Sequence, residues 1–237
     1  MRTVLLLLLT LLLYALLYSF TAVMLIVCIA ASYLPWKGLL TGAIQFWARS
    51  LFVLTGTSLQ VTGKENIPSQ RNYMILANHT SLFDIPAIMA VFPWVSWLGR
   101  EYLTRIPLFN HMQKRMNFVS VSKNPGIDVR RIIRQSVSGA QRFSIALFPE
   151  GTRTIDGQLQ PLKRGFIHIM RGANLDIVPV TLHGLFELKP KTRFTIHPFQ
   201  RCHITIHPPL RFNHLVELSN SEIINRVTTA LTTTSHN

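Results

Sequence analysis

The sequence predicts an α/β fold: a mixed, mostly parallel sheet flanked by helices, with an N-terminal apolar two-helix membrane anchor. Three observations lead to this prediction. Arg2 is the one charged side chain among the first 36 residues. From Ser58 onward, short apolar runs alternate with longer polar helical stretches, as in layered α/β domains. Polar motifs directly follow two of the apolar runs, and the carboxyl ends of strands are where open α/β sheets place their sites.

The first apolar run, Val4 to Leu34, has 31 uncharged residues and is ended by Pro35. As a helix it would be about 46 Å long, against a hydrocarbon core of roughly 30 Å, so it is long enough to span a bilayer. A cleaved secretory signal is the alternative. The run is about twice the usual apolar length of such a signal, which favours a retained anchor.

The second apolar stretch, Gly38 to Leu54, carries a polar side chain about every four residues. This spacing predicts a helix that lies in the membrane interface or folds back on the first one. Residues 1–56 are therefore predicted to form the anchor and residues 57–237 the globular domain. Lys37, Arg49 and the basic domain outweigh Arg2, which predicts a membrane protein with its domain on the cytoplasmic face.

Seven strands and five helices are predicted after the anchor. The strands are Ser58–Thr62, Tyr73–Leu76, Val95–Leu98, Phe118–Val121, Ser144–Phe148, Ile177–Leu182 and Cys202–His207. The helices are Leu82–Val91, Leu108–Arg115, Gly126–Gln141, Lys163–Arg171 and Ser221–Thr232.

The globular part is basic, with 21 Lys and Arg against ten Asp and Glu after Val61, a net charge of +11. A basic domain favours an anionic partner: nucleic acid, lipid headgroups or a phosphorylated small molecule. The apolar N-terminus favours the last two. Among the bases, Lys163 and Arg164 lie just before Gly165, at the start of a predicted helix, and are well placed to bind a phosphate.

The first motif is NHTSLFD, Asn78 to Asp84, directly after the apolar run YMILA. His79 can act as a general base, and a carboxylate on one ring nitrogen would leave the other basic. Residues five apart on an ideal helix lie about 140° and 7.5 Å apart, so His79 and Asp84 meet only if His79 lies in the preceding loop. The alternatives are a polar loop histidine and a capping box formed by Ser81 and Asp84.

The second motif is LFPEGTR, Leu147 to Arg153, again directly after an apolar run. Gly151 permits a tight turn, and backbone N–H groups, Thr152 and Arg153 would bind a phosphate. Glu150 can accept a hydrogen bond from Arg153 or from a substrate hydroxyl. The alternative is an ordinary turn with a surface Glu–Arg pair.

Other chemistry is not indicated. His197, His203, His207 and Cys202 are interpreted as a polar strand face, because no acidic or supporting partner accompanies them, so no metal site is expected. The sequence has no GxSxG, Walker, HExxH or post-strand GxGxxG motif, which argues against common serine hydrolases, P-loop nucleotidases, zincins and dinucleotide oxidoreductases.

NHTSLFD followed about 65 residues later by FPEGTR resembles the glycerolipid acyltransferases, typified by the 1-acylglycerol-3-phosphate (lysophosphatidic acid) acyltransferase family. The resemblance covers roughly Val61 to Leu210. It implies that His79 is the base and Asp84 its orienting carboxylate. It further implies that Glu150, Gly151 and Arg153 bind the glycerol phosphate of the acceptor.

One block departs from the family pattern. The family ends it in Asp-Arg, and this chain has Ser122-Lys123, so Lys123 keeps the positive charge without bidentate geometry. The family arginine binds phosphate, which makes acceptor choice the open point.

The implied reaction is direct transfer of an acyl group from acyl-CoA or acyl-carrier protein, as co-substrate, to the free hydroxyl of a lysophospholipid in the bilayer. Arg153, Lys123 and Lys163 would hold the phosphate, and no cofactor, metal or nucleic acid is expected. Two alternatives remain: a relative that acts on another acceptor, such as glycerol 3-phosphate or a different lysophospholipid, and a non-enzymatic lipid-binding membrane protein.

Overall fold

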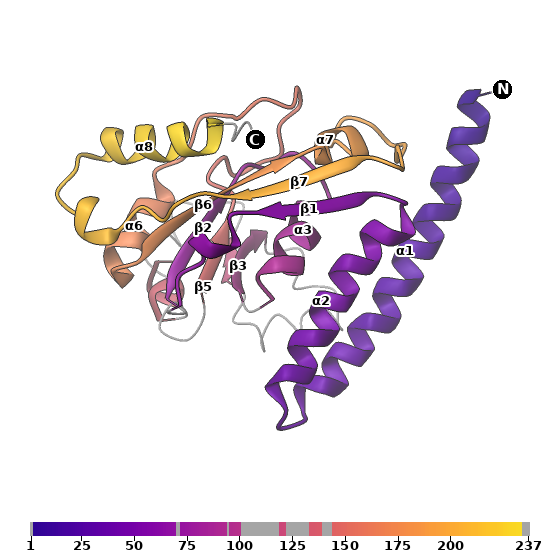
Figure 1. The fold of residues 1–237 in the computed structure, drawn as a ribbon, viewed down its shortest axis with the longest axis horizontal. Helices are drawn as coiled ribbons and strands as arrows, with labels where there is room; N and C mark the ends of the chain where they lie inside the picture. Colours follow the sequence, from indigo (N-terminus) through magenta and orange to yellow (C-terminus); the bar gives the residue numbers. More distant parts are fainter. Residues whose placement is uncertain are drawn as a thin grey trace.

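The structure is a computed structural model that describes residues 2–69, 72–93, 95–100, 119–121, 133–138 and 144–233. Two long helices come first, followed by a sheet with helices on both faces (Figure 1). The helices are α1 (Arg2–Ser32), α2 (Lys37–Leu54), η1 (Lys64–Asn66), α3 (Asp84–Val91), α6 (Gly165–Ala173), α7 (Leu185–Leu188), η3 (Phe212–His214) and α8 (Asn220–Thr232). The strands are β1 (Ser58–Thr62), β2 (Tyr73–Ala77), β3 (Val95–Arg100), β4 (Val119–Val121), β5 (Ser144–Leu147), β6 (Asp176–His183) and β7 (Arg201–Ile206).

The seven strands form one mixed sheet in the order β1-β7-β6-β2-β5-β3-β4. Every neighbouring pair is parallel except β6 and β7, so β7 and β1 run opposite to the other five strands. The mixed, mostly parallel sheet expected from the sequence is therefore confirmed. All five residues of β2 are buried, as the uninterrupted apolar run YMILA requires of a strand covered on both faces.

Successive strand residues point to opposite faces of the sheet and so serve two apolar cores. Ile75 belongs to the core shared with α1, α2 and α3, whereas Met74 and Leu76 belong to the core shared with α6 and α8. The sheet is thus the middle layer between two sets of helices (Figure 1).

The α1 and α2 helices form a hairpin whose tip contains Pro35, where the fixed proline backbone interrupts the helix. The indole N–H of Trp47 donates to the hydroxyl of Thr21 at 3.2 Å, which joins the two helices. The α2 helix in turn packs on α3, where the rings of Phe52 and Phe83 lie 5.8 Å apart. Of the described helices, Thr3–Ser32 is the one long and apolar enough to cross a membrane by length and composition.

The α1 helix also contacts the globular part directly. Its Thr10 hydroxyl accepts a hydrogen bond from the Ile196 N–H at 3.2 Å, and the Tyr14 hydroxyl donates to the Phe194 carbonyl at 2.9 Å. One apolar core therefore runs from the hairpin into the sheet. The division into an anchor of residues 1–56 and a domain of residues 57–237 stays a prediction.

The predicted strands agree with the observed ones to within two residues. The helix expected to begin at Leu82 begins at Asp84, because the preceding backbone N–H groups bind the Asp84 side chain. The short α7 helix was not predicted. The expected helix Leu108–Arg115 lies outside the described residues, as does most of Gly126–Gln141, of which residues 133–138 are helical.

Candidate functional site

The two motifs lie side by side at the carboxyl end of the sheet. NHTSLFD follows β2 and FPEGTR follows β5, and these strands are adjacent and parallel, with Ile75 opposite Ala146. Parallel neighbours bring the loops at their carboxyl ends together, although about 65 residues separate the motifs in the sequence.

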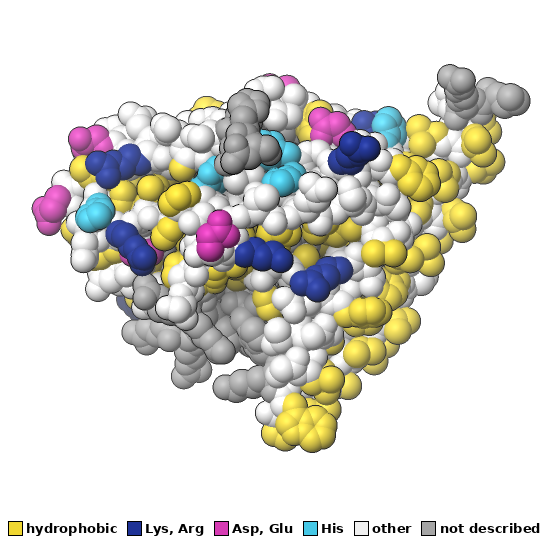
Figure 2. Space-filling model, in the orientation of Figure 1, with side chains coloured by type: hydrophobic (Ala, Val, Ile, Leu, Met, Phe, Trp, Pro, Cys, Tyr) yellow, Lys and Arg dark blue, Asp and Glu magenta, His cyan; other side chains and the backbone are white. Residues whose placement is uncertain are grey.

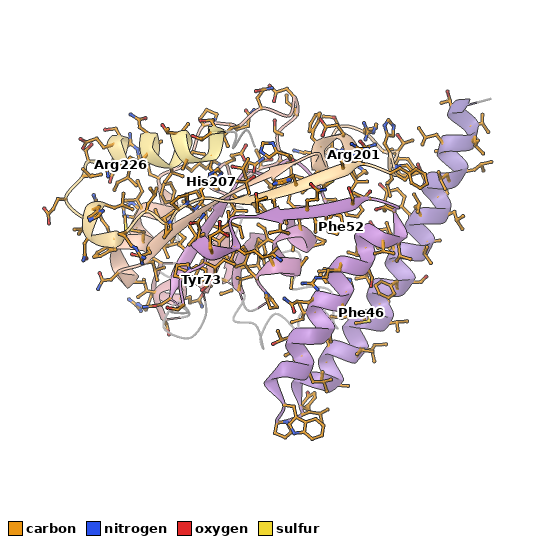
Figure 3. All side chains as sticks on the ribbon, viewed as in Figure 1. Phe46, Phe52, Tyr73, Arg201, His207 and Arg226 are labelled. Carbon is orange, nitrogen blue, oxygen red and sulfur yellow. The ribbon has the colours of Figure 1, made fainter. Side chains whose placement is uncertain are left out.

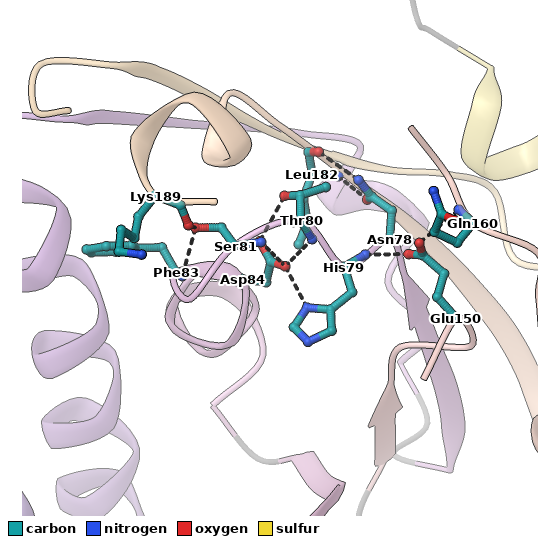
Figure 4. Close-up of polar contacts among 10 residues, drawn as sticks. All are labelled: Asn78, His79, Thr80, Ser81, Phe83, Asp84, Glu150, Gln160, Leu182 and Lys189. Carbon is teal, nitrogen blue, oxygen red and sulfur yellow. Dashed lines mark hydrogen bonds and ion pairs between the residues drawn. The ribbon is translucent and has the colours of Figure 1, made fainter. Parts of the chain in front are cut away.

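The His79 ring and the Asp84 carboxylate are hydrogen-bonded, with Nδ1 2.7 Å from Oδ2 (Figure 4). His79 lies in the loop before α3 and Asp84 is the first residue of that helix, so the side chains meet in the one geometry that their spacing permits. The His79 side chain is 19% exposed and that of Asp84 is fully buried. A substrate can therefore reach the imidazole but not the carboxylate.

The Asp84 carboxylate also organises the loop around His79. Its Oδ2 atom accepts from the N–H groups of Thr80 at 2.6 Å and Ser81 at 2.8 Å, and Oδ1 accepts from the Thr80 hydroxyl at 3.2 Å. Because the carboxylate is an acceptor, His79 Nδ1 must carry the proton, and Nε2 is left as the basic nitrogen. This arrangement can accept a proton from a nearby hydroxyl group.

The capping-box alternative is present in part: the Asp84 carboxylate accepts the Ser81 N–H at 2.8 Å, and the Ser81 hydroxyl accepts the Phe83 N–H at 3.2 Å instead of the Asp84 N–H. The α3 helix is capped by Phe83 without a side-chain cap, and the Ser81 hydroxyl donates to the Lys189 carbonyl at 2.8 Å. The bond from the Ser81 hydroxyl to the Lys189 carbonyl and a bridge between Ser81 and Pro190 join the His79 loop to the segment after α7.

A phenylalanine of the second motif packs on the His79 imidazole, with a tryptophan of β3 beside it. The Phe148 ring stacks on the His79 ring with centroids 3.9 Å apart and planes 7° apart. The Trp97 ring lies next to Phe148, at 5.6 Å. This stacking fixes the plane of the imidazole in addition to the Asp84 bond.

Glu150 is 2% exposed, and both of its carboxylate oxygens accept backbone hydrogen bonds. Oε1 accepts from the His79 N–H at 2.6 Å and Oε2 from the Gln160 N–H at 2.9 Å (Figure 4). Burial raises the pKa of Glu150, and these two bonds oppose the rise. The contact between Glu150 and the acceptor that the family resemblance implies stays a prediction.

The remaining members of FPEGTR face outward. Gly151 has φ +73° and, like Thr152, is exposed, while Arg153 is half-buried. A Cβ atom on Gly151 would lie 2.7 Å from the Lys163 Nζ, so the structure brings that lysine onto the turn. The Lys163 N–H also donates to the Pro149 carbonyl at 2.8 Å. These groups form an accessible basic surface beside the FPEGTR turn, whereas Lys123 lies outside the described residues.

Two contributors to this site were missed in the sequence, and a third, Asn78, was recognised only as the first residue of a motif. Thr154 donates its N–H to the His79 carbonyl at 2.8 Å, and Gln160 donates to Glu150. The Asn78 amide exchanges two hydrogen bonds with the Leu182 backbone on β6. Thr154 and Gln160 act through backbone groups, which every residue carries, so no residue type could have indicated them.

Two histidines, His203 within β7 and His207 directly after it, bind threonines. His207 Nε2 lies 2.7 Å from the Thr181 hydroxyl, and His203 Nε2 lies 2.9 Å from the Thr62 hydroxyl. Within the described part of the chain, no group of three or more His, Cys, Asp or Glu side chains is arranged to hold a metal ion.

The family model described as Acyltransferase matches residues 58–183, which is more than half of the chain. The 1-acyl-sn-glycerol-3-phosphate acyltransferase of Cocos nucifera is 30% identical over 176 residues, covering 70% of this chain and 55% of that protein. The enzyme of the same name from Borreliella burgdorferi is 33% identical over 141 residues, covering 55% of this chain and 53% of that protein. The chain thus spans about half the length of these curated relatives.

A solved structure resembles nearly the whole chain. The crystal structure of the 1-acyl-sn-glycerophosphate (LPA) acyltransferase PlsC from Thermotoga maritima superposes with a TM-score of 0.82 at 26% sequence identity. The match covers 98% of this chain and 95% of that one, so it includes the N-terminal helices as well as the sheet.

Proposed function

The chain belongs to the acyltransferase family, and we propose that it transfers a fatty acyl group to the free hydroxyl of 1-acylglycerol 3-phosphate, giving phosphatidic acid. The observation that carries this proposal is the His79–Asp84 pair, at 2.7 Å, beside the exposed turn of FPEGTR. The acceptor follows from the names of the relatives from Cocos nucifera, Borreliella burgdorferi and Thermotoga maritima.

His79 is the general base of the proposed reaction. Its Nε2 atom takes the proton of the acceptor hydroxyl while that oxygen attacks the thioester carbonyl carbon of the donor. The carbon–sulfur bond then breaks, and the proton passes from His79 to the leaving thiolate, which restores the neutral imidazole. Asp84 holds Nδ1–H throughout and stabilises the transient imidazolium. The transfer needs no covalent acyl-enzyme.

Arg153, Lys163 and Lys123 bind the acceptor phosphate in this proposal. Arg153 supplies paired donors and Lys163 a flexible charge next to the Gly151 turn. The donor is acyl-CoA or acyl-carrier protein, because CoA is anionic, carrier proteins are acidic, and the domain is basic.

The α1–α2 hairpin is the membrane anchor of the proposed enzyme. Hydrophobic side chains cover the outer side of the hairpin (Figure 2). Exposed apolar residues there include Leu5, Leu8, Leu12, Tyr18, Val23, Ile26, Trp36, Phe46 and Val53.

The contacts of α1 with the globular part indicate how the hairpin lies in the membrane. Tyr14 and Thr10 contact the loop after α7, which carries the basic residues Lys191 and Arg193. If α1 crossed the bilayer, this basic loop would be drawn into hydrocarbon, at a high cost in free energy. The hairpin therefore lies along one membrane surface, with the domain on the cytoplasmic face as the charge distribution predicts.

The test is acyl transfer by the purified full chain in detergent, with labelled oleoyl-CoA or acyl-carrier protein as donor and a panel of acceptors. We expect phosphatidic acid from lysophosphatidic acid, and a rate about 10²–10⁴-fold lower in His79→Ala. His168→Ala, at an exposed histidine of α6, is the matched control and should leave the rate unchanged. An unaltered rate in His79→Ala would remove the proposed base, and product from another acceptor alone would correct the substrate.

A further inference from the structure

The peptide backbone of His79 is held from both sides, by the second motif and by the residue that follows it. Its N–H donates to Glu150 Oε1 at 2.6 Å, and its carbonyl accepts from the Thr154 N–H at 2.8 Å. The two loops are therefore joined at the residue that carries the imidazole. Figure 4 shows Glu150 reaching the His79 backbone from the side opposite to Asp84.

Glu150 is committed to this contact by its burial. The side chain is 2% exposed, and its second oxygen accepts from the Gln160 N–H at 2.9 Å. The carboxylate thus cross-links His79 to the segment that leads toward Lys163. At 2% exposure, a carboxylate that already holds two backbone N–H groups offers almost no surface to a ligand.

The charge of Glu150 argues in the same direction. An acidic group in direct contact with the acceptor's phosphate end would repel it, whereas the exposed Thr152 and the half-buried Arg153 next in sequence offer favourable contacts. Burial behind the loop removes the carboxylate from the surface that the phosphate approaches. The motif therefore divides into an inward-facing half, Phe148 and Glu150, and an outward-facing half, Gly151 to Arg153.

We propose that Glu150 is a positioning residue that fixes the backbone of the catalytic His79, and that it is not a ligand of the acceptor's glycerol phosphate. This inference rests on the proposed role of His79 as the base. The Asp84 bond and the Phe148 stack orient the imidazole ring about its side-chain bonds, and Glu150 with Thr154 fixes the point from which that side chain starts. Both are required because the base must lie within hydrogen-bonding distance of the hydroxyl that it deprotonates.

Steady-state kinetics separate positioning from binding. In Glu150→Gln the side-chain shape is kept, but one carboxylate oxygen becomes an NH₂ group that faces a backbone N–H. We expect kcat to fall about 10²-fold, the size expected for a base displaced by about 1 Å, with the KM for lysophosphatidic acid within about twofold of wild type. Arg153→Gln, in contrast, should raise that KM. Glu217→Gln, at an exposed glutamate before α8, is the control and should change neither constant. A raised KM with unchanged kcat in Glu150→Gln would overturn the inference.

Amide hydrogen exchange tests the same contact without turnover. Glu150→Ala and Glu150→Gln should both speed exchange of the His79 amide, while exchange in the buried strand β6 stays as in wild type. Unchanged exchange at His79 in a folded variant would overturn the inference, and the Gln variant decides the question if the Ala variant does not fold. A wild-type chain that fails to acylate lysophosphatidic acid would refute the proposed function, but the exchange result would still decide whether Glu150 holds His79.

Discussion

At Asp84, one fully buried carboxylate serves four donors: the His79 ring, the Thr80 N–H and hydroxyl, and the Ser81 N–H. Three of them converge on a single oxygen, Oδ2. The same atom therefore folds the loop and sets the tautomer of the base, so a change at this residue must affect both stability and activity.

A comparison of Asp84→Asn with Asp176→Asn separates the effect on activity from the effect on stability. Asparagine brings an NH₂ group among buried donors, so we expect kcat to fall about 10²–10⁴-fold and the free energy of unfolding to drop by about 1–3 kcal/mol. Asp176 begins β6 at the opposite end of the sheet and binds Arg211 and the Phe212 N–H. Its variant should lose stability but keep kcat. Comparable losses of kcat in both variants, in acyl-transfer assays paired with urea unfolding, would contradict the special role of Asp84.

His207 gives the protein a pH-dependent stability at a site remote from catalysis. It is 6% exposed, and burial, with a smaller contribution from His183, lowers its pKa. The unfolded chain then binds a proton more readily than the folded one, so the stability is fully present above about pH 6.5 and is lost as the pH falls from there through the lower pKa of the folded protein. We expect the melting temperature of the wild type to drop between pH 7.5 and 5.5, and to drop less in His207→Gln. The same change at the exposed His168 should leave the wild-type pH dependence intact.

The sequence could predict the residues that touch one another through side chains, but not those that act through the backbone. The spacing of His79 and Asp84 allowed one arrangement in which they meet, and the structure has it. For Glu150, the acidic side chain lies in a motif that we expected to bind phosphate, which suggested a substrate contact. The sequence alone does not reveal that this side chain is buried at the turn. Its partners are the N–H groups of His79 and Gln160, which carry no residue-specific signal.

At the scale of elements, strands were predictable from apolar runs but their order was not. The sequence pattern of β1 and β7 does not distinguish them from the other strands. They nevertheless pair with each other and run opposite to the remaining five strands. That direction depends on the connections through α7 and the loop that follows it. The same loop also contacts α1, which no local pattern indicated.

The position of the α7–β7 loop, residues 189–200, leads to a prediction about its contact with the membrane. Phe194 is 58% exposed and Phe199 is 77% exposed, and Phe199 adopts φ +61°, which is unusual for a bulky residue. The loop is bonded to α1, on the side of the proposed anchor. Arg226 lies on α8, far from the hairpin (Figure 3). Because the loop also carries Lys191 and Arg193, which stay at the membrane surface, these contacts predict that Phe199 inserts at the membrane interface while Arg226 stays in water.

Spin labels at these two positions test the prediction in vesicles of phosphatidylcholine and phosphatidylglycerol. Both native cysteines, Cys28 and Cys202, are buried, and burial raises the pKa of Cys202 to about 12, so Phe199→Cys and Arg226→Cys should label selectively. We expect the label at 199 to be relaxed by oxygen and protected from a water-soluble nickel complex, and the label at 226 to show the reverse. Equal exposure of both labels to the nickel complex would show that the loop lies clear of the bilayer.

For the whole molecule, the anchor and the sheet share one apolar core. That core contains Ile44, Ala48 and Phe52 of α2 together with Ile88 of α3 and Ile75 of β2. Phe52 is 2% exposed and contacts Phe83, the residue directly before Asp84. The hairpin therefore covers the helix that begins with Asp84, in addition to the membrane contact that we propose for it.

This shared core predicts that residues 57–237 do not form a soluble, active domain on their own. Removing residues 1–56 would expose the buried face of α3, and Phe52→Ala in the full chain should cost about 3–5 kcal/mol of unfolding free energy, a large part of the usual 5–15 kcal/mol. Circular dichroism, size exclusion and acyl-transfer assays of both proteins measure the effect. Phe46→Ala, on the exposed outer side of α2, is the matched control, because it loses little packing and should keep its stability in detergent. A truncated chain that remained monomeric, folded and active in detergent-free buffer would show that the hairpin is only an anchor, since no part of the site would then depend on it.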